Sequence, residues 1–182
     1  MKKQRWTIFS IILLVSAALW IIVTVDHSQA SIAGIVPAPR AGFLSPDFSL
    51  QTLNGEEMTL SELKGHPVII NYWASWCVPC RSEMPAIEEA YAAYQDQGVI
   101  VLAVNATNQD SLSDVASFTE EHNLTFPILI DSEGKVGALY EVLALPTTFF
   151  VQADGIVQDV VVGGPMAEAL LVTRIERLLE VK

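Results

Sequence analysis

Both cysteines of the chain, Cys77 and Cys80, lie at a point where the hydrophobic pattern changes. Residues 68–70, just upstream, form a continuous apolar and β-branched run, which is typical of a strand buried on both faces. Downstream, apolar residues recur at helical spacing over residues 87–94. The pattern therefore predicts that the cysteine pair marks the junction between a central strand and a helix.

This position makes the two thiols chemically unequal. Cys77 would lie near the helix N-terminus, where free backbone N–H groups and the positive end of the helix dipole stabilise a thiolate. Cys80 would lie one turn further in, where it is more shielded. We therefore expect Cys77 to attack a substrate disulfide and Cys80 to resolve the mixed disulfide, leaving the substrate reduced. The same steps in reverse would oxidise a substrate dithiol.

A structural disulfide or half of a zinc site are the alternative interpretations of the pair. A structural zinc site needs four ligands, but the other soft or imidazole side chains, His27, His66 and His122, have no paired spacing. A disulfide across so short a loop also contributes little chain-entropy stabilisation. The pattern therefore favours a redox-active disulfide that works without a metal or another cofactor.

The N-terminal part of the chain has the composition of a membrane segment. Residues 6–25 carry no formal charge, are rich in Ile, Leu and Val, and follow a basic cluster within the first five residues. An apolar run of this length spans a bilayer, and the basic flank keeps the N-terminus cytoplasmic. We predict that residues 1–30 form a cytoplasmic tip and an uncleaved signal-anchor, with cleavage after Ala30 as the alternative. The protein would then be single-pass, with its C-terminal domain on the extracytoplasmic side of the cell membrane.

The rest of the chain divides into a tether and one domain. Residues 31–42 mix Ala, Pro, Gly and Ser, which predicts an exposed, mobile tether, and residues 43–182 form the domain. The formal net charge of the chain is -11 although the N-terminal cluster is basic. So acidic a domain argues against nucleic acid as a partner and is compatible with basic polypeptides, although solubility alone would explain it.

Periodicity and turn residues place the remaining elements. Strands alternate with helices and end in a β-hairpin, which indicates an α/β domain with a mixed central sheet flanked by helices. A proline at position 85 should kink the helix that follows the cysteines. The expected elements are a hairpin of 48–53 with 57–60, a helix from Cys80 to about Gln97, strands 99–104 and 126–130, a helix from Asp110 or Ser111 to about His122, a short helix 136–140, a hairpin of 145–151 with 156–162, and a closing helix after Pro165.

Two separated motifs resemble the thioredoxin superfamily, whose active-site helix starts at W-C-x-P-C and faces a cis-proline loop. The motifs here are Trp76 to Cys80 and Leu145-Pro146-Thr147. The longer match W-C-x-P-C-x-x-E-x-P, which ends at Pro85, resembles the TlpA/ResA-like membrane-anchored thiol-disulfide oxidoreductases. The resemblance covers residues 41–182. It implies a thioredoxin-like fold with an N-terminal β-hairpin and a central helix-strand insertion, preceded by one transmembrane helix.

The resemblance also implies a substrate-binding set of Trp76, Pro79, Leu145 and Pro146. Pro146 would be the cis-proline beside Cys77, and the backbone of Leu145 would pair with an extended substrate chain. Trp73 and Trp76 would pack beside the disulfide and form part of its apolar rim. The hydrophobic pattern alone predicts that both tryptophans are core residues.

The third member of the implied catalytic set, after Cys77 and Cys80, is Glu83. Asn71 occupies the strand position where thioredoxins carry a buried aspartate, and an amide cannot transfer protons. Glu83 matches the acidic residue of the family and would exchange a proton as Cys80 attacks the mixed disulfide. The alternative is a surface glutamate that favours the first half of the helix.

With a carboxylate nearby and no additional positive charge around Cys77, we expect a reductant. The resemblance implies exported proteins with disulfides as substrates, apocytochrome c during cytochrome c maturation among them, and a transmembrane thiol donor as electron source. Val78 stands where ResA-like members often carry an acid.

Two rival functions share the scaffold. A peroxiredoxin-like peroxidase has a proline and a Thr or Ser at fixed spacing before its reactive cysteine, and Ile70 and Ala74 occupy those places here. A non-catalytic chaperone or binding module would use only the groove at Pro146.

Overall fold

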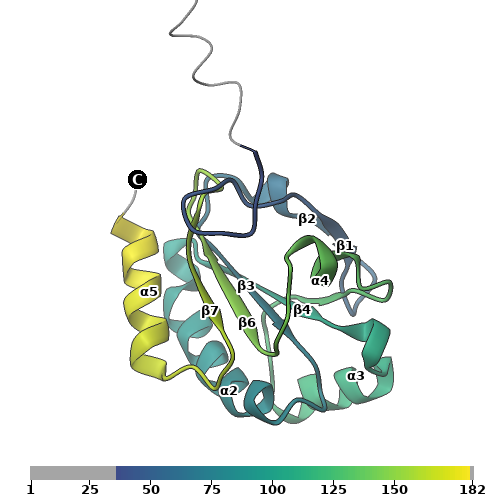
Figure 1. Cartoon of the computed structure of the whole chain (residues 1–182). Coiled ribbons are helices and arrows are strands. Elements are labelled where there is room, and N and C mark those ends of the chain that lie inside the picture. Colours follow the sequence, from purple (N-terminus) through teal and green to yellow (C-terminus); the bar gives the residue numbers. More distant parts are fainter. Residues whose placement is uncertain (1–35, 181–182) are drawn as a thin grey trace, which may run out of the picture. The chain divides into compact units, whose positions relative to one another are not determined.

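The computed structural model describes residues 36–180 (Figure 1). The predicted membrane segment, residues 6–25, lies outside this part of the chain and stays a prediction. Within residues 36–180 no helix combines the length and the apolar character that a bilayer crossing requires. The folded unit begins at Pro37, and the Gly42 N–H donates to the carbonyl of Val157 at 2.8 Å. The end of the predicted tether therefore belongs to the domain.

A five-stranded sheet in the order β5-β4-β3-β6-β7 forms the centre of the domain. Strand β3 is buried at every position, as its β-branched run predicts. It pairs in parallel with β4, which pairs in parallel with β5, and it pairs antiparallel with β6, which forms a hairpin with β7. The predicted mixed sheet is confirmed. The strands are β3 (Val68–Trp73), β4 (Ile100–Asn105), β5 (Ile128–Ile130), β6 (Thr147–Val151) and β7 (Val157–Val162).

Three helices, α2 (Val78–Tyr94), α3 (Leu112–Glu121) and α5 (Glu168–Glu180), cover one face of the sheet. Helices α2 and α3 are the crossovers between parallel strands, and α5 packs beside α2 (Figure 1). Ile69 and Trp73, which alternate on this face of β3, are buried against the helices. The carboxyl end of the central strand β3 leads into the start of α2, so the cysteine pair lies at one end of the strands.

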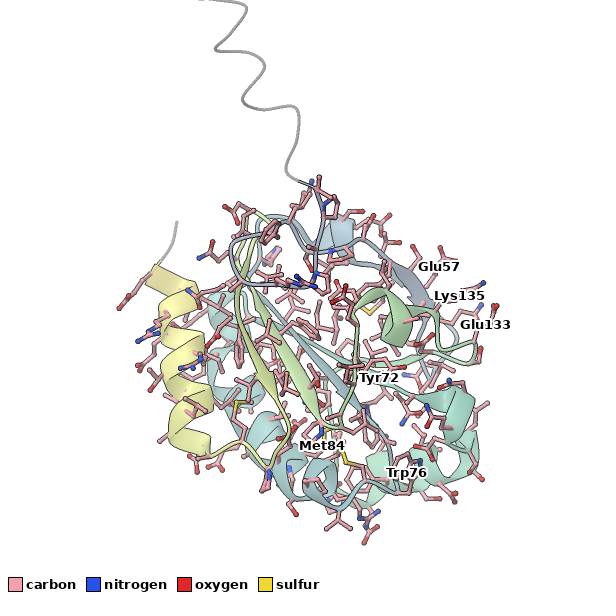
Figure 2. All side chains as sticks on the ribbon, in the orientation of Figure 1. Glu57, Tyr72, Trp76, Met84, Glu133 and Lys135 are labelled. Carbon is pink, nitrogen blue, oxygen red and sulfur yellow. A yellow bond between two sulfur atoms is a disulfide. The ribbon has the colours of Figure 1, made fainter. Side chains whose placement is uncertain are left out.

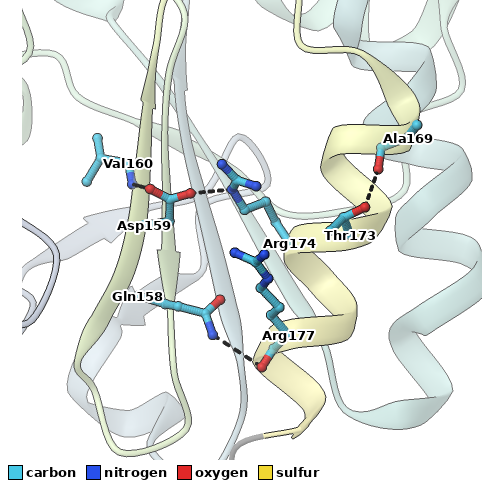
Figure 3. A network of polar contacts seen from close by, with 7 residues as sticks. All are labelled: Gln158, Asp159, Val160, Ala169, Thr173, Arg174 and Arg177. Atoms are coloured by element: carbon cyan, nitrogen blue, oxygen red, sulfur yellow. Dashed lines mark hydrogen bonds and ion pairs between the residues drawn. The ribbon is translucent and has the colours of Figure 1, made fainter.

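Polar contacts attach α5 to the edge strand β7 (Figure 3). Arg174 forms an ion pair with Asp159, and the Gln158 side chain donates to the carbonyl of Arg177 at 3.2 Å. Leu171 and Ile175 on the inner side of the same helix are buried in the core. The helix is thus held by apolar burial, and the polar contacts orient it along the strand.

The other face of the sheet is covered by α4 (Lys135–Leu139) and the hairpin of β1 (Ser49–Gln51) with β2 (Glu57–Thr59), followed by a 3-10 turn at Leu60–Leu63. Tyr140, which caps α4, makes edge-to-face contacts with Phe48 and Phe149, with ring centroids 5.6 and 4.9 Å apart. The hairpin is confirmed, and Gly55 adopts the positive φ of 86° that its turn requires.

The bounds of the helices agree with the prediction, but the burial of one residue in α3 does not. Helix α2 runs without interruption through Pro85, and a 3-10 turn carries the chain to Gly98, whose φ of 89° ends it. The side chain of Ser111 caps α3. The spacing of apolar residues in this helix predicts that Leu112 lies on its buried side with Val115 and Phe118, but Leu112 is 53% exposed. The prediction is wrong because α3 meets the sheet through a narrow stripe of Val115 and Phe118.

Candidate active site around Cys77 and Cys80

The two cysteines form a disulfide at the start of α2, where β3 ends. Cys77 is the N-cap of the helix, and its Sγ accepts a hydrogen bond from the Cys80 N–H at 3.3 Å. Cys77 is 5% exposed and Cys80 is fully buried. A thiolate at Cys77 would accept a hydrogen bond from the same N–H group, an arrangement that suits the nucleophile expected at this position.

A groove of about 660 Å³ opens beside the disulfide. It brings together three of the predicted site residues, Trp76, Pro79 and Leu145, with Cys77 itself. None of the described residues that line it carries a charged side chain. The other lining residues are Tyr72, Val78, Ala106, Asn108, Gln109, Gly134, Gly137, Ala138, Val142, Leu143 and Ala144.

The two predicted rim tryptophans occupy different environments. Trp76 is 55% exposed at the groove, and its indole N–H donates to the carbonyl of Gln109 at 2.9 Å (Figure 2). Trp73 is fully buried, and its ring centroid lies 5.3 Å from that of Phe118. The predicted rim position of Trp73 is wrong, because position 73 points to the helix-covered face of β3.

Pro146 precedes β6, and the peptide bond between Leu145 and Pro146 is cis. Strand β6 pairs with β3 so that Thr147 lies opposite Tyr72, which carries Pro146 to the end of the sheet where the cysteines lie. Pro146 itself is buried and does not line the groove. Its ring instead lies against Gly164, in the turn between β7 and α5.

Glu83 is 2% exposed, so the alternative of a surface glutamate is wrong. One carboxylate oxygen accepts from the Asn71 side chain and the other from the Met166 N–H, each at 2.9 Å. Burial raises the pKa of Glu83 above its ordinary value, and the two hydrogen bonds oppose that rise without cancelling it. A buried carboxyl with a raised pKa, one helical turn beyond Cys80, is of the kind that exchanges protons with a neighbouring group.

Asn71 holds the Glu83 carboxylate from the neighbouring strand. Its Nδ2 donates both to Glu83 and to the Thr148 hydroxyl at 2.9 Å, and the residue is fully buried. Its Oδ1 has no hydrogen-bond partner among residues 36–180. The amide therefore presents only donors to Glu83, whereas an aspartate at this position would place a second negative charge there.

The loop before Cys77 is held by Asp110, a residue that the sequence indicated only as one of two possible helix caps. Both carboxylate oxygens of Asp110 accept from Ser75, from its N–H and its hydroxyl, each at 2.6 Å, and Asn105 adds a third bond at 2.9 Å. Burial alone would raise the pKa of Asp110, but the hydrogen bonds from Ser75, Asn105 and Ser111 outweigh it and hold the pKa below its ordinary value. Because Ser111 caps α3, Asp110 is left to fix the active-site loop.

Comparison with known proteins agrees with this geometry. Residues 42–160 match the AhpC/TSA family. The chain belongs to this family. Thioredoxin-like protein YneN of Bacillus subtilis is 46% identical over 125 residues, which are 68% of this chain and 72% of that protein. Thiol-disulfide oxidoreductase ResA of Geobacillus thermodenitrificans is 39% identical over 165 residues, 90% of this chain and 91% of that protein.

A solved structure agrees as well. The crystal structure of thiol:disulfide interchange protein DsbE from Chlorobium tepidum superimposes with a TM-score of 0.70 at 32% identity, covering 76% of this chain and 97% of that one. The protein is thus a thiol-disulfide oxidoreductase of the ResA/DsbE type with a thioredoxin-like fold, and its redox-active group is the Cys77–Cys80 disulfide. Within the described part of the chain no three His, Cys, Asp or Glu side chains gather as a metal site would require.

Proposed function

We propose that this oxidoreductase is tethered to the cell membrane on its extracytoplasmic side and reduces disulfides in exported proteins. The observation that carries the direction of the reaction is the charge around the cysteine pair. Glu83 is a buried carboxyl one turn beyond Cys80, and no described residue of the groove is cationic. Such surroundings stabilise a thiolate less than those of strongly oxidising relatives, so the dithiol gives up its electrons more readily.

Arg81, the cation nearest in sequence, is directed elsewhere. Its guanidinium lies 4.7 Å from the centroid of the Phe118 ring and donates to the carbonyl of Ser75 at 3.2 Å. It therefore contributes to the packing between α2 and α3. The helix N-terminus is left as the main source of thiolate stabilisation at Cys77.

In the reductive direction the Cys77 thiolate attacks one sulfur of the substrate disulfide and releases the other as a thiolate, which takes up a proton. Cys80 then transfers its proton to the Glu83 carboxylate and attacks Sγ of Cys77. The bond between Cys77 and the substrate breaks, and the second substrate sulfur leaves as a thiolate that is protonated in turn. Two electrons pass to the substrate, and the Cys77–Cys80 disulfide forms.

The groove supports an extended polypeptide as substrate. Leu145 offers its backbone beside the cysteine pair, and pairing with an extended chain tolerates many sequences. Trp76, Val78 and Leu143 are 55%, 72% and 95% exposed around the groove, which suits uncharged and apolar side chains next to the substrate cysteines. By resemblance, apocytochrome c is such a client, since its C-x-x-C-H motif must be reduced before haem attachment.

The membrane-bound location is supported by the sequence of residues 6–25. Because no reducing thiol pool is expected outside the cytoplasm, the electrons would come from a transmembrane thiol donor. The strongly acidic composition does not favour nucleic acid as a partner.

The experiment is a substrate trap with the Cys80→Ala variant in the intact chain. Without the resolving thiol, mixed disulfides through Cys77 should accumulate, run as higher-mass species on non-reducing gels and disappear on reduction. A variant that lacks both cysteines is the matched control and should trap nothing. A non-catalytic binding module would give no trapped species, and that result would sink the proposal.

A measured reduction potential tests the direction. We expect a value more negative than about -200 mV, on the reducing side of the strong oxidant DsbA. A potential in the range of the strong oxidants would refute the reductive assignment. A peroxide-consumption assay separates the peroxidase rival, for which we expect no activity, because Ile70 and Ala74 replace its motif.

A further inference from the structure

The turn between β7 and α5, residues 163–166, touches both halves of the site. The N–H of Gly163 donates to the carbonyl of Pro146 at 2.7 Å. Three residues later, the N–H of Met166 donates to the Glu83 carboxylate at 2.9 Å. One short backbone segment thus binds the proline loop beside the substrate groove and the carboxyl group behind Cys80.

Gly164 lies between these two contacts, in a space that has no room for a side chain. A Cβ at this position would come 2.6 Å from Cγ of Pro146 and 2.8 Å from Oε2 of Glu83. Both distances are shorter than any ordinary van der Waals contact of a Cβ. Gly164 does not have a positive φ, so the position requires glycine for space and not for backbone conformation.

We propose that Gly164 is a positioning residue of the thiol-disulfide exchange, which sets the spacing between Pro146 and Glu83. The inference rests on the proposed function, which assigns substrate docking to the backbone of Leu145, directly before Pro146, and proton transfer to Glu83. The backbone at Leu145 and Pro146 places the substrate disulfide, and the carboxylate takes the proton of Cys80. Because both groups lie against Gly164, the turn fixes the position of the docking backbone relative to the carboxylate that takes the proton.

The electrostatics of Glu83 depend on the same turn. Its two hydrogen-bond partners, the Asn71 amide from β3 and the Met166 N–H from the turn, are both neutral. The nearest ionisable groups on its own helix are Arg81, whose guanidinium contacts the Phe118 ring and the carbonyl of Ser75, and the thiols of the reduced pair at the start of the helix. A methyl group at position 164 that displaced the carboxylate would weaken the bond to Met166, which opposes the effect of burial on the Glu83 pKa.

The test is the Gly164→Ala variant of the full chain. Its kcat/KM is measured from pH 5 to 9 with a synthetic peptide that contains a Cys-x-x-Cys disulfide, with dithiothreitol as electron source. Relief of a 2.6 Å contact requires a shift of several tenths of an ångström, and misplacement on this scale lowers rates by about 10- to 100-fold. We expect a loss of kcat/KM in this range. We also expect the part of the pH–rate profile that depends on Glu83, which Glu83→Gln should abolish, to shift to higher pH.

Gly55→Ala is the matched control. Gly55 has a positive φ of 86° but no atom within 4 Å of an added Cβ, and it lies in the β1–β2 turn. That variant should lose stability through backbone strain and keep the wild-type rate and profile. A folded Gly164→Ala protein with a wild-type rate and profile overturns the inference, while trapping by Cys80→Ala would leave the proposed function standing.

If Gly164→Ala alone does not fold, the double variant Gly164→Ala/Glu83→Ala decides. Removing the carboxylate relieves the contact at 2.8 Å, so the double variant should fold and show the cooperative urea transition that Gly164→Ala lacks. A double variant that also fails to fold would overturn the inference.

Discussion

Replacing Asn71 by aspartate should convert the Glu83 site into a pair of interacting carboxyl groups. The Asn71 side chain lies 2.9 Å from Oε1 of Glu83, and the two residues are 0% and 2% exposed. Two like charges 4 Å apart at an effective dielectric constant of 20 repel by about 4 kcal/mol. That repulsion corresponds to roughly three pKa units, so the pair keeps one shared proton well above the ordinary range of a carboxyl group.

Two measurements test this prediction. The rate of disulfide exchange is measured as a function of pH, and the free energy of unfolding is measured by urea titration at each pH. We expect the limb that depends on Glu83 to move upward by about one to three pH units, because relaxation of the site absorbs part of the repulsion. A carboxyl whose folded pKa lies above its unfolded pKa stabilises the fold at low pH, and this stability is lost as the pH rises through the folded value. Asn71→Asp should therefore fall behind wild type in stability from about pH 4 upward.

Asn54→Asp is the control for net charge, since Asn54 is exposed in the β1–β2 turn. It adds the same charge away from Glu83 and should leave both profiles at their wild-type positions. An Asn71→Asp profile that superimposes on that of the wild type would refute the reasoning, because it would mean either that Glu83 does not interact with position 71 or that Glu83 does not determine the pH dependence.

Three further substitutions probe the same site. Glu83→Gln should slow exchange and flatten its pH dependence in stopped-flow measurements, and an unchanged pH–rate profile would remove Glu83 from the mechanism. Asp110→Asn weakens the contacts to Ser75 and should cost about 1–2 kcal/mol of unfolding free energy at pH 7 by urea titration. Because the folded pKa of Asp110 is lowered, its contribution is present above the unfolded pKa and is lost as pH falls, so the difference between variant and wild type should shrink in acid; a constant difference would contradict this. Tyr72→Phe removes the hydrogen bond to Asp131, 2.8 Å long and buried, and should cost about 1–3 kcal/mol in the same titration, whereas a wild-type midpoint would show that the bond contributes nothing.

The fold could be predicted largely from local patterns. The apolar run of β3, the Asn54-Gly55 turn and the helical spacing after Cys80 each indicate their element without knowledge of distant residues. The order of the strands follows from the resemblance, since a periodic pattern does not say which strands pair. The exposure of Leu112 was missed for a related reason: a short helix buries only the stripe that its neighbours reach.

The candidate site was predictable in its sulfur chemistry and less so in its surroundings. Cys77 and Cys80 are adjacent on one helix turn, so their inequality follows from helix geometry. The burial of Glu83 depends on Met166 and Gly164, which lie some eighty residues further along the chain. Nothing in the local pattern around position 83 distinguishes a buried carboxyl from an exposed one.

The activity therefore depends on two separate parts of the fold. The disulfide requires only the junction of β3 and α2, whereas proton transfer also requires the turn that precedes α5. That turn is held by the burial of α5 and by the ion pair between Arg174 and Asp159. Substitutions that weaken the packing of α5 against the sheet should therefore slow the pH-dependent resolving step by Cys80 more than they slow the first attack by Cys77.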